Sequence, residues 1–269
     1  MEKTETINGK LEWLKEFWRY KELLYFFVWR DVKVKYKQTV LGALWAVIQP
    51  FFTMVVFTIF FGKLAKMPSD GIPYPVFSYS ALVPWTYFTV ALSSAGNCLV
   101  GNSNLLTKVY FPRIAIPVGS VLAGLIDFFI ASVLLGGIMI YFDIPFSWSL
   151  IFWPILVIPL MLLALGLGML LAAMNVRFRD IKYTIPFGIQ ILMFLTPIIY
   201  PMSIVPEKYR IFISLNPLSG IIDTFRCIVT HNKPIDFVSL GISFVVILVI
   251  LVIGLSVFRN TEKSFADLV

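Results

Sequence analysis

Charged side chains are scarce in this chain: Asp, Glu, Lys and Arg make up 14% of its 269 residues, and hydrophobic residues make up 59%. Soluble domains carry about 25% charged residues. The scarcity is concentrated in six long stretches that lack ionisable groups other than Tyr and Cys, apart from a single Asp127. These stretches are 38–62, 71–107, 114–142, 144–176, 183–206 and 237–258. A helix needs roughly 20 apolar residues to cross a bilayer core, so the sequence predicts a polytopic membrane protein and excludes a soluble domain.

The predicted fold is all-α, with six transmembrane helices, an N-terminal amphipathic interfacial helix and short re-entrant gate helices on the external side. The spans are expected near residues 39–62, 79–100, 114–141, 149–174, 184–201 and 237–258. Residues 1–37 would form a cytoplasmic N-terminus, 38–259 the transmembrane domain and 260–269 a cytoplasmic tail.

The net charge of +7 is explained by topology. An even number of spans places both termini on one side, and most of the 22 Lys and Arg residues flank the spans on that side. Basic residues accumulate in cytoplasmic segments. We therefore expect both termini in the cytoplasm and no nucleic-acid partner.

Motifs of nucleotide binding and hydrolysis are also missing. The sequence has no G-x-x-x-x-G-K-[ST] loop, no G-x-S-x-G and no H-E-x-x-H. Its only histidine, His231, lies in an outer loop, and its two cysteines, Cys98 and Cys227, lack metal-ligand spacing. We therefore expect no catalytic residue, metal site or cofactor in this chain, and two cysteines that act as small buried apolar residues.

Asp127 is the one acidic residue inside a predicted span. Intramembrane acids can serve as proton relays. The sequence shows no evident partner for Asp127, so we expect a structural hydrogen bond or an interface contact there. If the protein is a transporter, this acid would not supply proton coupling, and the energy for transport would come from another chain.

Residues 11–30 have an apolar side and a charged side at helical spacing, which is typical of a helix lying in a membrane interface. Basic residues follow this segment at Arg30, Lys33, Lys35 and Lys37. They could attract a phosphate-bearing lipid headgroup, with each cation contributing about 1 kcal/mol of attraction to an anionic lipid surface. The positive-inside rule explains them equally well.

The loop 101–116 between the second and third spans is short and predicts a tight cytoplasmic turn. Pro112 would end a helix after Phe111. We expect a short helix that presents an exposed aromatic knob and two cations, Lys108 and Arg113, to a soluble partner.

The segment 202–236 forms the longest external link, and it is not plainly hydrophilic. Asn216 and Pro217 have the pattern of an N-cap followed by proline at the first helical position. Asp223 and Arg226 lie three residues apart on the helix that follows, so they can form an ion pair. Exchanging the two charges should then preserve the pair in part. This segment is expected to dip back towards the membrane as short helices. In the preceding span, 184–201, proline residues would leave backbone carbonyl groups without helical hydrogen bonds, so these carbonyls need other partners.

Aromatic residues are abundant, with 25 Phe, 11 Tyr and 7 Trp. Many are expected at the membrane interfaces. Rings inside the spans could instead line a sugar-sized passage, because an aromatic face stacks on many sugars. The candidate lining residues are Trp45, Phe51, Trp85, Tyr87 and Phe88; simple packing against lipid is the alternative for each.

Three runs carry a family resemblance: 41–88, NSNLLTKVYFPRIAIP (102–117) and LNPLSGIIDTFR (215–226). In order and spacing they resemble the membrane subunit of ATP-binding-cassette exporters of lipid-linked polysaccharides, nearest to the O-antigen exporters. The resemblance covers roughly residues 20–260.

The resemblance implies a homodimer with a central channel and two copies of a separate nucleotide-binding subunit, which would bind the ATP and Mg. The substrate would be a glycan on undecaprenyl diphosphate, exported across the inner membrane. Arg30, Lys33, Lys35 and Lys37 could then attract the diphosphate of this carrier. The residues that resemble the coupling helix are Lys108, Tyr110, Phe111, Pro112 and Arg113. The segment 205–229 resembles the external gate, and the first and fifth spans resemble the channel lining.

Other interpretations remain open. The same architecture could export teichoic acid, capsule or a small hydrophobic compound. An integral-membrane glycan ligase would need a catalytic residue outside the membrane, where the candidates are Asp70, Glu207, Asp223, Asp236 and His231. A membrane scaffold protein would show no dependence on nucleotide.

Overall fold

The computed structural model describes residues 20–37, 41–103, 105, 111–178, 180–231 and 233–262, and the regular elements within these ranges are helices. The α-helices are α2 (Lys21–Lys37), α3 (Trp45–Phe57), α4 (Tyr74–Gly101), α6 (Ala115–Ala123), α7 (Leu125–Tyr141), α8 (Val157–Arg177), α9 (Ile181–Leu195), α10 (Glu207–Ser214), α11 (Pro217–Thr230) and α12 (Phe237–Glu262). Short 3-10 or π segments are η1 (Gly42–Leu44), η2 (Thr58–Leu64), η3 (Trp148–Phe152) and η4 (Met202–Ile204). The predicted all-α fold is confirmed. The first part of the predicted interfacial helix 11–30 lies outside the described residues.

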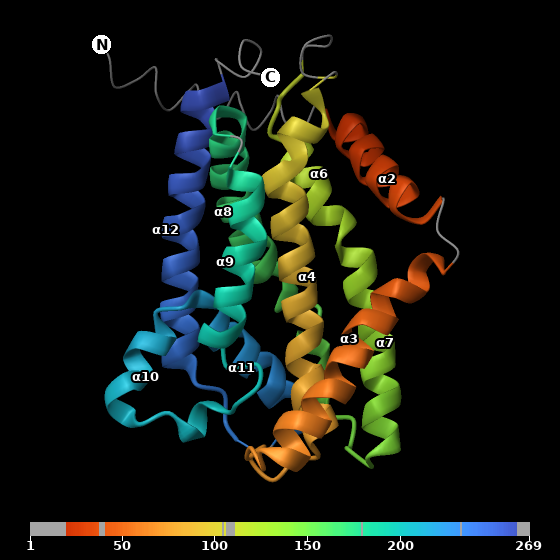
Figure 1. The fold of residues 1–269 in the computed structure, drawn as a ribbon, viewed down its shortest axis with the longest axis vertical. Coiled ribbons are helices and arrows are strands. Elements are labelled where there is room, and N and C mark those ends of the chain that lie inside the picture. The colour runs from red at the N-terminus through yellow and green to blue at the C-terminus, as the bar shows by residue number, and fades with distance from the viewer. Residues whose placement is uncertain are drawn as a thin grey trace.

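The long helices stand side by side along the long axis of the molecule (Figure 1). Helix α2 and the last turns of α12 lie at one end, which we call the α2 end. The short helices α10 and α11 lie at the opposite end, which we call the α11 end. The predicted topology would place the α2 end in the cytoplasm and the α11 end outside.

Four helical segments are long and apolar enough to cross a membrane: Gly42–Leu64, Ala115–Tyr141, Trp148–Arg177 and Phe237–Glu262. They coincide with four of the predicted spans. The pair α10 and α11 could form a fifth, or a re-entrant loop, because the two helices are bent by 104°. Helix α4 has 28 residues but carries several hydroxyl and amide side chains, and α9 has only 15 residues. The count of six spans therefore stays a prediction.

Helix α4 forms the centre of the bundle, since it packs against α3, α6, α7, α8 and α11. Two of its buried hydroxyl groups find partners on other helices: Tyr79 donates to the carbonyl of Ala131, and Tyr87 donates to the carbonyl of Val121, both at 3.3 Å. Polar side chains that bond across helices are tolerated inside a membrane bundle. This explains how a less apolar helix can occupy the centre.

Glycines set the closest helix contacts. A Cβ atom on Gly254 of α12 would lie 2.1 Å from the carbonyl oxygen of Gly166 on α8. A Cβ atom on Gly168 would lie 2.5 Å from the Cβ of Ala95 on α4. Small residues let membrane helices approach closely enough for backbone packing, so α8 is held tightly between α4 and α12. The two cysteines, Cys98 and Cys227, are buried and free, as expected.

Candidate functional site

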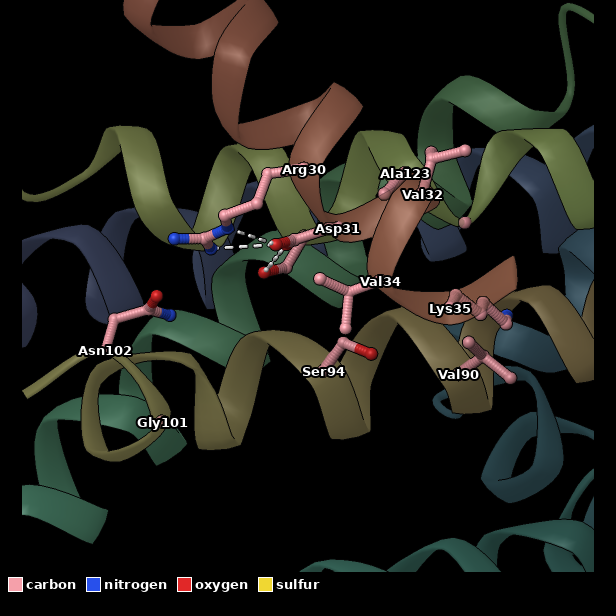
Figure 2. Close-up of a pocket in the computed structure, with 12 residues that line it drawn as sticks. Arg30, Asp31, Val32, Val34, Lys35, Val90, Ser94, Gly101, Asn102 and Ala123 are labelled. Carbon is pink, nitrogen blue, oxygen red and sulfur yellow. Dashed lines mark hydrogen bonds and ion pairs between the residues drawn. The ribbon is translucent and has the colours of Figure 1, made fainter. Parts of the chain in front are cut away.

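A cavity of about 620 Å³ lies at the α2 end, between α2, α4 and α6 (Figure 2). Its polar lining residues are Arg30, Asp31, Lys35, Ser94, Asn102 and Ser120. Its apolar lining comes mainly from valine and alanine side chains. A cavity with two cations, several hydrogen-bonding groups and an apolar wall suits an anionic group attached to a lipid.

Arg30 is held at the wall of this cavity by its neighbour in sequence. Its Nε and terminal nitrogen donate to Oδ1 of Asp31 at 3.0 and 2.7 Å. The hydroxyl of Ser120 on α6 donates to the other carboxylate oxygen at 3.0 Å. The guanidinium also lies 5.0 Å from the ring centroid of Phe27. Arg30 is therefore orientated in advance, and its charge is partly balanced by Asp31.

Lys35 pairs with the intramembrane acid. Its ammonium contacts Oδ2 of Asp127 on α7, and the hydroxyl of Tyr36 donates to Oδ1 of the same carboxylate. Both carboxylate oxygens of Asp127 are thus engaged by the last turns of α2. This confirms the expected hydrogen bond at Asp127, and it identifies partners that the sequence did not indicate.

The four predicted basic residues of α2 divide into two pairs. Arg30 and Lys35 line the cavity. Lys33 and Lys37 do not line it. Attraction of a phosphate group stays a prediction for all four residues, and the cavity favours Arg30 and Lys35 for direct contact.

The five aromatic residues predicted to line a channel fall into an exposed group on α3 and a buried group on α4. Trp45 and Phe51 on α3 are exposed by 54% and 36%. Trp85, Tyr87 and Phe88 are buried, with 5%, 2% and 0% exposure, because α4 is enclosed by other helices. This corrects the prediction for the three α4 rings, which lie in the core of the helix bundle, although Tyr87 and Trp45 both border a small cavity of about 70 Å³. The lining role stays a prediction for Trp45 and Phe51.

The structure also revises the expected coupling knob. Lys108 and Tyr110 lie outside the described residues. Phe111 is buried, with 6% exposure, and its ring centroid lies 5.5 Å from that of Phe27 on α2. The prediction of an exposed ring at Phe111 is wrong, because α2 covers this position.

The residues after Phe111 contact the end of α12. The half-buried Arg113, which follows the half-buried Pro112, donates from its backbone N–H to Oε1 of Glu262 at 3.3 Å and from its guanidinium to the Glu262 carbonyl. The end of the loop is therefore fastened to both α2 and α12.

Gly119 allows α2 to sit this close to α6. A Cβ atom at Gly119 would lie 2.9 Å from the Cβ of Phe27. Gly119→Ala is expected to push α2 outwards and to destabilise the protein by about 1–3 kcal/mol, as overpacking does. The checks are the thermal unfolding midpoint and the rate of thiol labelling of Phe111→Cys, which should rise. Gly136→Ala on α7 is the control, because nothing lies within 4 Å of a Cβ there; equal behaviour of both variants would contradict the close contact.

At the α11 end, helix α11 begins as predicted. The side-chain oxygen of Asn216 accepts the N–H of Leu218 at 3.1 Å, and Pro217 occupies the first helical position. The amide of Asn216 also donates to the hydroxyl of Thr196 at 2.9 Å. The start of α11 is thereby tied to the end of α9.

Arg226 forms the predicted ion pair with Asp223, at 3.8 Å, and it also contacts backbone carbonyls and an aromatic ring. It is 1% exposed, and it donates to the carbonyls of Pro197 and Ile198 at 2.8 and 3.2 Å. Its guanidinium lies 3.8 Å from the ring centroid of Phe77. The carbonyls belong to the proline-containing segment that follows α9, so Arg226 satisfies groups that this segment leaves without helical partners.

A second cation joins this cluster. Lys233 lies 2.8 Å from Oδ2 of Asp70 and 3.7 Å from Oδ1 of Asp223, and Ser203 donates to Asp70 at 2.6 Å. Burial alone would lower the pKa of Lys233, but the carboxylates of Asp223 and Asp70 raise it above its usual value. Burial likewise opposes the charge of Asp70, yet the hydrogen bonds from Lys233 and Ser203 lower its pKa. Both groups are therefore charged at neutral pH.

The sequence did not indicate roles for Tyr36, Ser203 and Lys233, and it suggested Asp70 only as a candidate catalytic residue. Lys233 is one of four cations in the external link 202–236, and nothing in the sequence distinguishes it from the others. Its partner Asp223 lies in the same link, whereas Asp70 lies far earlier in the chain and is brought to Lys233 by the fold.

Comparisons with known proteins identify a family and several relatives. The sequence signature of the family described as "ABC-2 type transporter" matches residues 22–229. An O-antigen export system permease protein of Myxococcus xanthus is 28% identical over 260 residues, which cover 94% of this chain and 98% of that protein. A Klebsiella pneumoniae protein of the same name is 27% identical, with 89% and 92% covered. The polysialic acid transport protein KpsM of Escherichia coli is 25% identical, with 87% and 92% covered.

Proposed function

Since this chain belongs to the ABC-2 type transporter family, we propose that it is the membrane subunit of an ATP-driven exporter of O-antigen-type polysaccharide on undecaprenyl diphosphate. The observation that carries the proposal is the match to an O-antigen export permease along 94% of the chain. The glycan would cross the inner membrane, with both termini of this chain in the cytoplasm. The α2 end would then receive the substrate, and the α11 end would release it.

A channel between two copies would use the faces of α3 and α9. Both helices carry exposed aromatic rings, among them Trp45 and Phe52 on α3 and Phe187 on α9. Both also carry an exposed glutamine, Gln49 and Gln190. A polar side chain facing lipid is unfavourable, and membrane proteins direct such groups towards a partner or water. The two glutamines support a homodimer whose α3 and α9 faces border a polar passage.

The cavity at the α2 end would receive the carrier diphosphate. Arg30 offers a planar guanidinium and Lys35 a point charge, the two side chains that proteins use for phosphate. The apolar wall could accept the first part of the polyprenyl chain. Lys33 and Lys37 would add only general attraction at the membrane surface.

Energy would come from a separate nucleotide-binding subunit that holds ATP and Mg. We assign the contact with that subunit to the loop containing Lys108, Tyr110, Phe111, Pro112 and Arg113. Because Phe111 packs on Phe27, its part in this contact is indirect: it would pass the motion of the loop to α2.

The external gate would consist of α10 and α11. Arg226 holds α11 against α4 and the segment after α9, and Asn216 holds it against the end of α9. Pro217 starts α11, and Asp223 pairs with Arg226. Helix α10 is mostly exposed, so it is the freer of the two. We propose that α10 moves during export while α11 stays in place.

A capsule-type glycan is the second candidate substrate. The relative named as a polysialic acid transport protein supports it. The sequence contains no feature that distinguishes neutral from acidic sugars.

The test is to purify this chain with the ATPase encoded beside it and to measure ATP hydrolysis in nanodiscs. Lipid-linked glycan from the producing strain is expected to stimulate hydrolysis severalfold, whereas the carrier lipid without glycan should do so less. Lipid-linked capsular glycan separates the two candidates. A chain that forms no complex, or a complex whose hydrolysis ignores every lipid-linked glycan, would contradict the proposed function.

A further inference from the structure

Lys35 stands between two cavities. It lines the 620 Å³ cavity under α2, and it also lines the 70 Å³ cavity beside Trp45, Gln49 and Asp127. Val90 is shared as well, but Lys35 is the charged residue common to both. Figure 2 shows Arg30 and Lys35 at opposite ends of the stretch of α2 that borders the larger cavity.

The Lys35–Asp127 pair is open on one side only. The Lys35 side chain is 44% exposed, whereas that of Asp127 is 11% exposed. An anion in the larger cavity can therefore approach the ammonium, while the carboxylate stays behind it. Since a lysine is a flexible point charge with three donors, it can change partners by rotating its own side chain.

Tyr36 makes such an exchange feasible. A buried carboxylate that loses its cation is strongly unfavourable unless other donors remain. The Tyr36 hydroxyl contacts Oδ1 of Asp127, the oxygen that Lys35 does not use. Asp127 would keep this donor after Lys35 leaves.

From this geometry we infer that Asp127 competes with phosphate for Lys35. In this structure the ammonium is bound to Asp127 and forms part of the wall of the small cavity. A diphosphate lipid in the larger cavity draws the ammonium away, and the small cavity opens towards Trp45 and Gln49. Lys35 and Asp127 thereby control passage from the receiving cavity to the aromatic face of α3. The inference rests on the proposed function, because it concerns the carrier diphosphate of that substrate.

Competition predicts opposite effects of the two residues. A ligand that binds only the fraction of molecules with Lys35 released has an apparent affinity reduced by that fraction. Removing the competing carboxylate in Asp127→Asn should tighten diphosphate binding, by about tenfold if one molecule in ten has Lys35 released. Lys35→Gln should weaken it by a similar factor. In the double variant the gain from Asp127→Asn should disappear, because no ammonium remains to be released.

The experiment measures binding of farnesyl diphosphate and of inorganic pyrophosphate to the complex with its ATPase in nanodiscs without nucleotide. Farnesyl diphosphate is expected to bind more tightly than pyrophosphate, because the apolar wall of the cavity would contact its lipid part. Tighter binding of pyrophosphate would indicate a site for free phosphate and would overturn the inference of a lipid headgroup. Two controls remove charges elsewhere: Asp180→Asn and Lys21→Gln are exposed, do not line the cavities described here and should change affinity by less than about twofold.

Several results would overturn the inference. The first is that Asp127→Asn leaves diphosphate binding unchanged or weakens it. The second is that Asp127→Asn still tightens diphosphate binding in the Lys35→Gln background, which would mean that the loss of a negative charge, and not the release of Lys35, strengthens binding. If Asp127→Asn does not fold, Tyr36→Phe serves instead. It is expected to weaken diphosphate binding about threefold, because Asp127 would have no tyrosine donor left when Lys35 leaves. Unchanged binding in Tyr36→Phe would refute the exchange. Normal stimulation by lipid-linked glycan together with unresponsive variants would refute the exchange and leave the proposed function intact.

Discussion

Arg226→Gln is expected to destabilise the protein by about 3–5 kcal/mol, the range found when one partner of a buried ion pair is removed. Among the described residues, the substitution leaves Lys233, at 3.7 Å, as the cation paired with Asp223, and it removes the donors to the carbonyls of Pro197 and Ile198. Pro197 and Ile198 are buried, so their carbonyls cannot bond to water instead. The thermal unfolding midpoint of the purified protein in nanodiscs measures the effect, which should also appear as a low yield of folded protein.

Arg210→Gln is the matched control. Arg210 is exposed and also donates to a backbone carbonyl, that of Val205, at 3.0 Å. Its replacement should change stability by less than about 1 kcal/mol, as for other exposed polar contacts. Similar losses in both variants would show that the burial of Arg226 does not matter.

The environment of Arg226 also changes the expectation for a charge exchange. A simple ion pair at this helical spacing would survive reversal. In the double variant Asp223→Arg/Arg226→Asp, the new carboxylate would face the carbonyls of Pro197 and Ile198 and the ring of Phe77. No rescue relative to Arg226→Gln is therefore expected, and partial rescue would mean that the ion pair outweighs the carbonyl contacts.

Gly254→Ala is expected to have the second large effect, a loss of about 3 kcal/mol or more, at the upper end for overpacked sites. The added Cβ would lie 2.1 Å from the carbonyl oxygen of Gly166 and 2.8 Å from its carbonyl carbon. Because both contacts are to backbone, no side chain can move aside, and α8 and α12 must separate. Thermal unfolding in nanodiscs again provides the measurement.

The control for this site lies on the same helix. Nothing is within 4 Å of a Cβ at Gly241, so Gly241→Ala should be neutral or slightly stabilising, because alanine favours helix by about 0.5–1 kcal/mol over glycine. If Gly254→Ala is as well tolerated as Gly241→Ala, then α8 and α12 do not meet at Gly166.

Local sequence determined several features correctly. Long uncharged stretches predicted the membrane helices, and four of them satisfy length and composition in the structure. The cap at Asn216 and the pair Asp223–Arg226 were predictable because both depend on residues within one helical turn. Such contacts follow from helix geometry alone, so they do not require knowledge of the fold.

The surroundings of each side chain were decided by the tertiary structure. Asp127 and Lys35 are 92 residues apart in sequence, and Phe111 is buried only because α2 covers it. The sequence predicts a channel-lining role for Trp85, Tyr87 and Phe88, whereas the structure buries all three rings in the core. In a membrane protein, residues that face lipid and residues that face other helices are equally apolar. Apolar patterning therefore reveals which segments enter the membrane, whereas the packing of the helices decides which faces are covered and which charged groups meet.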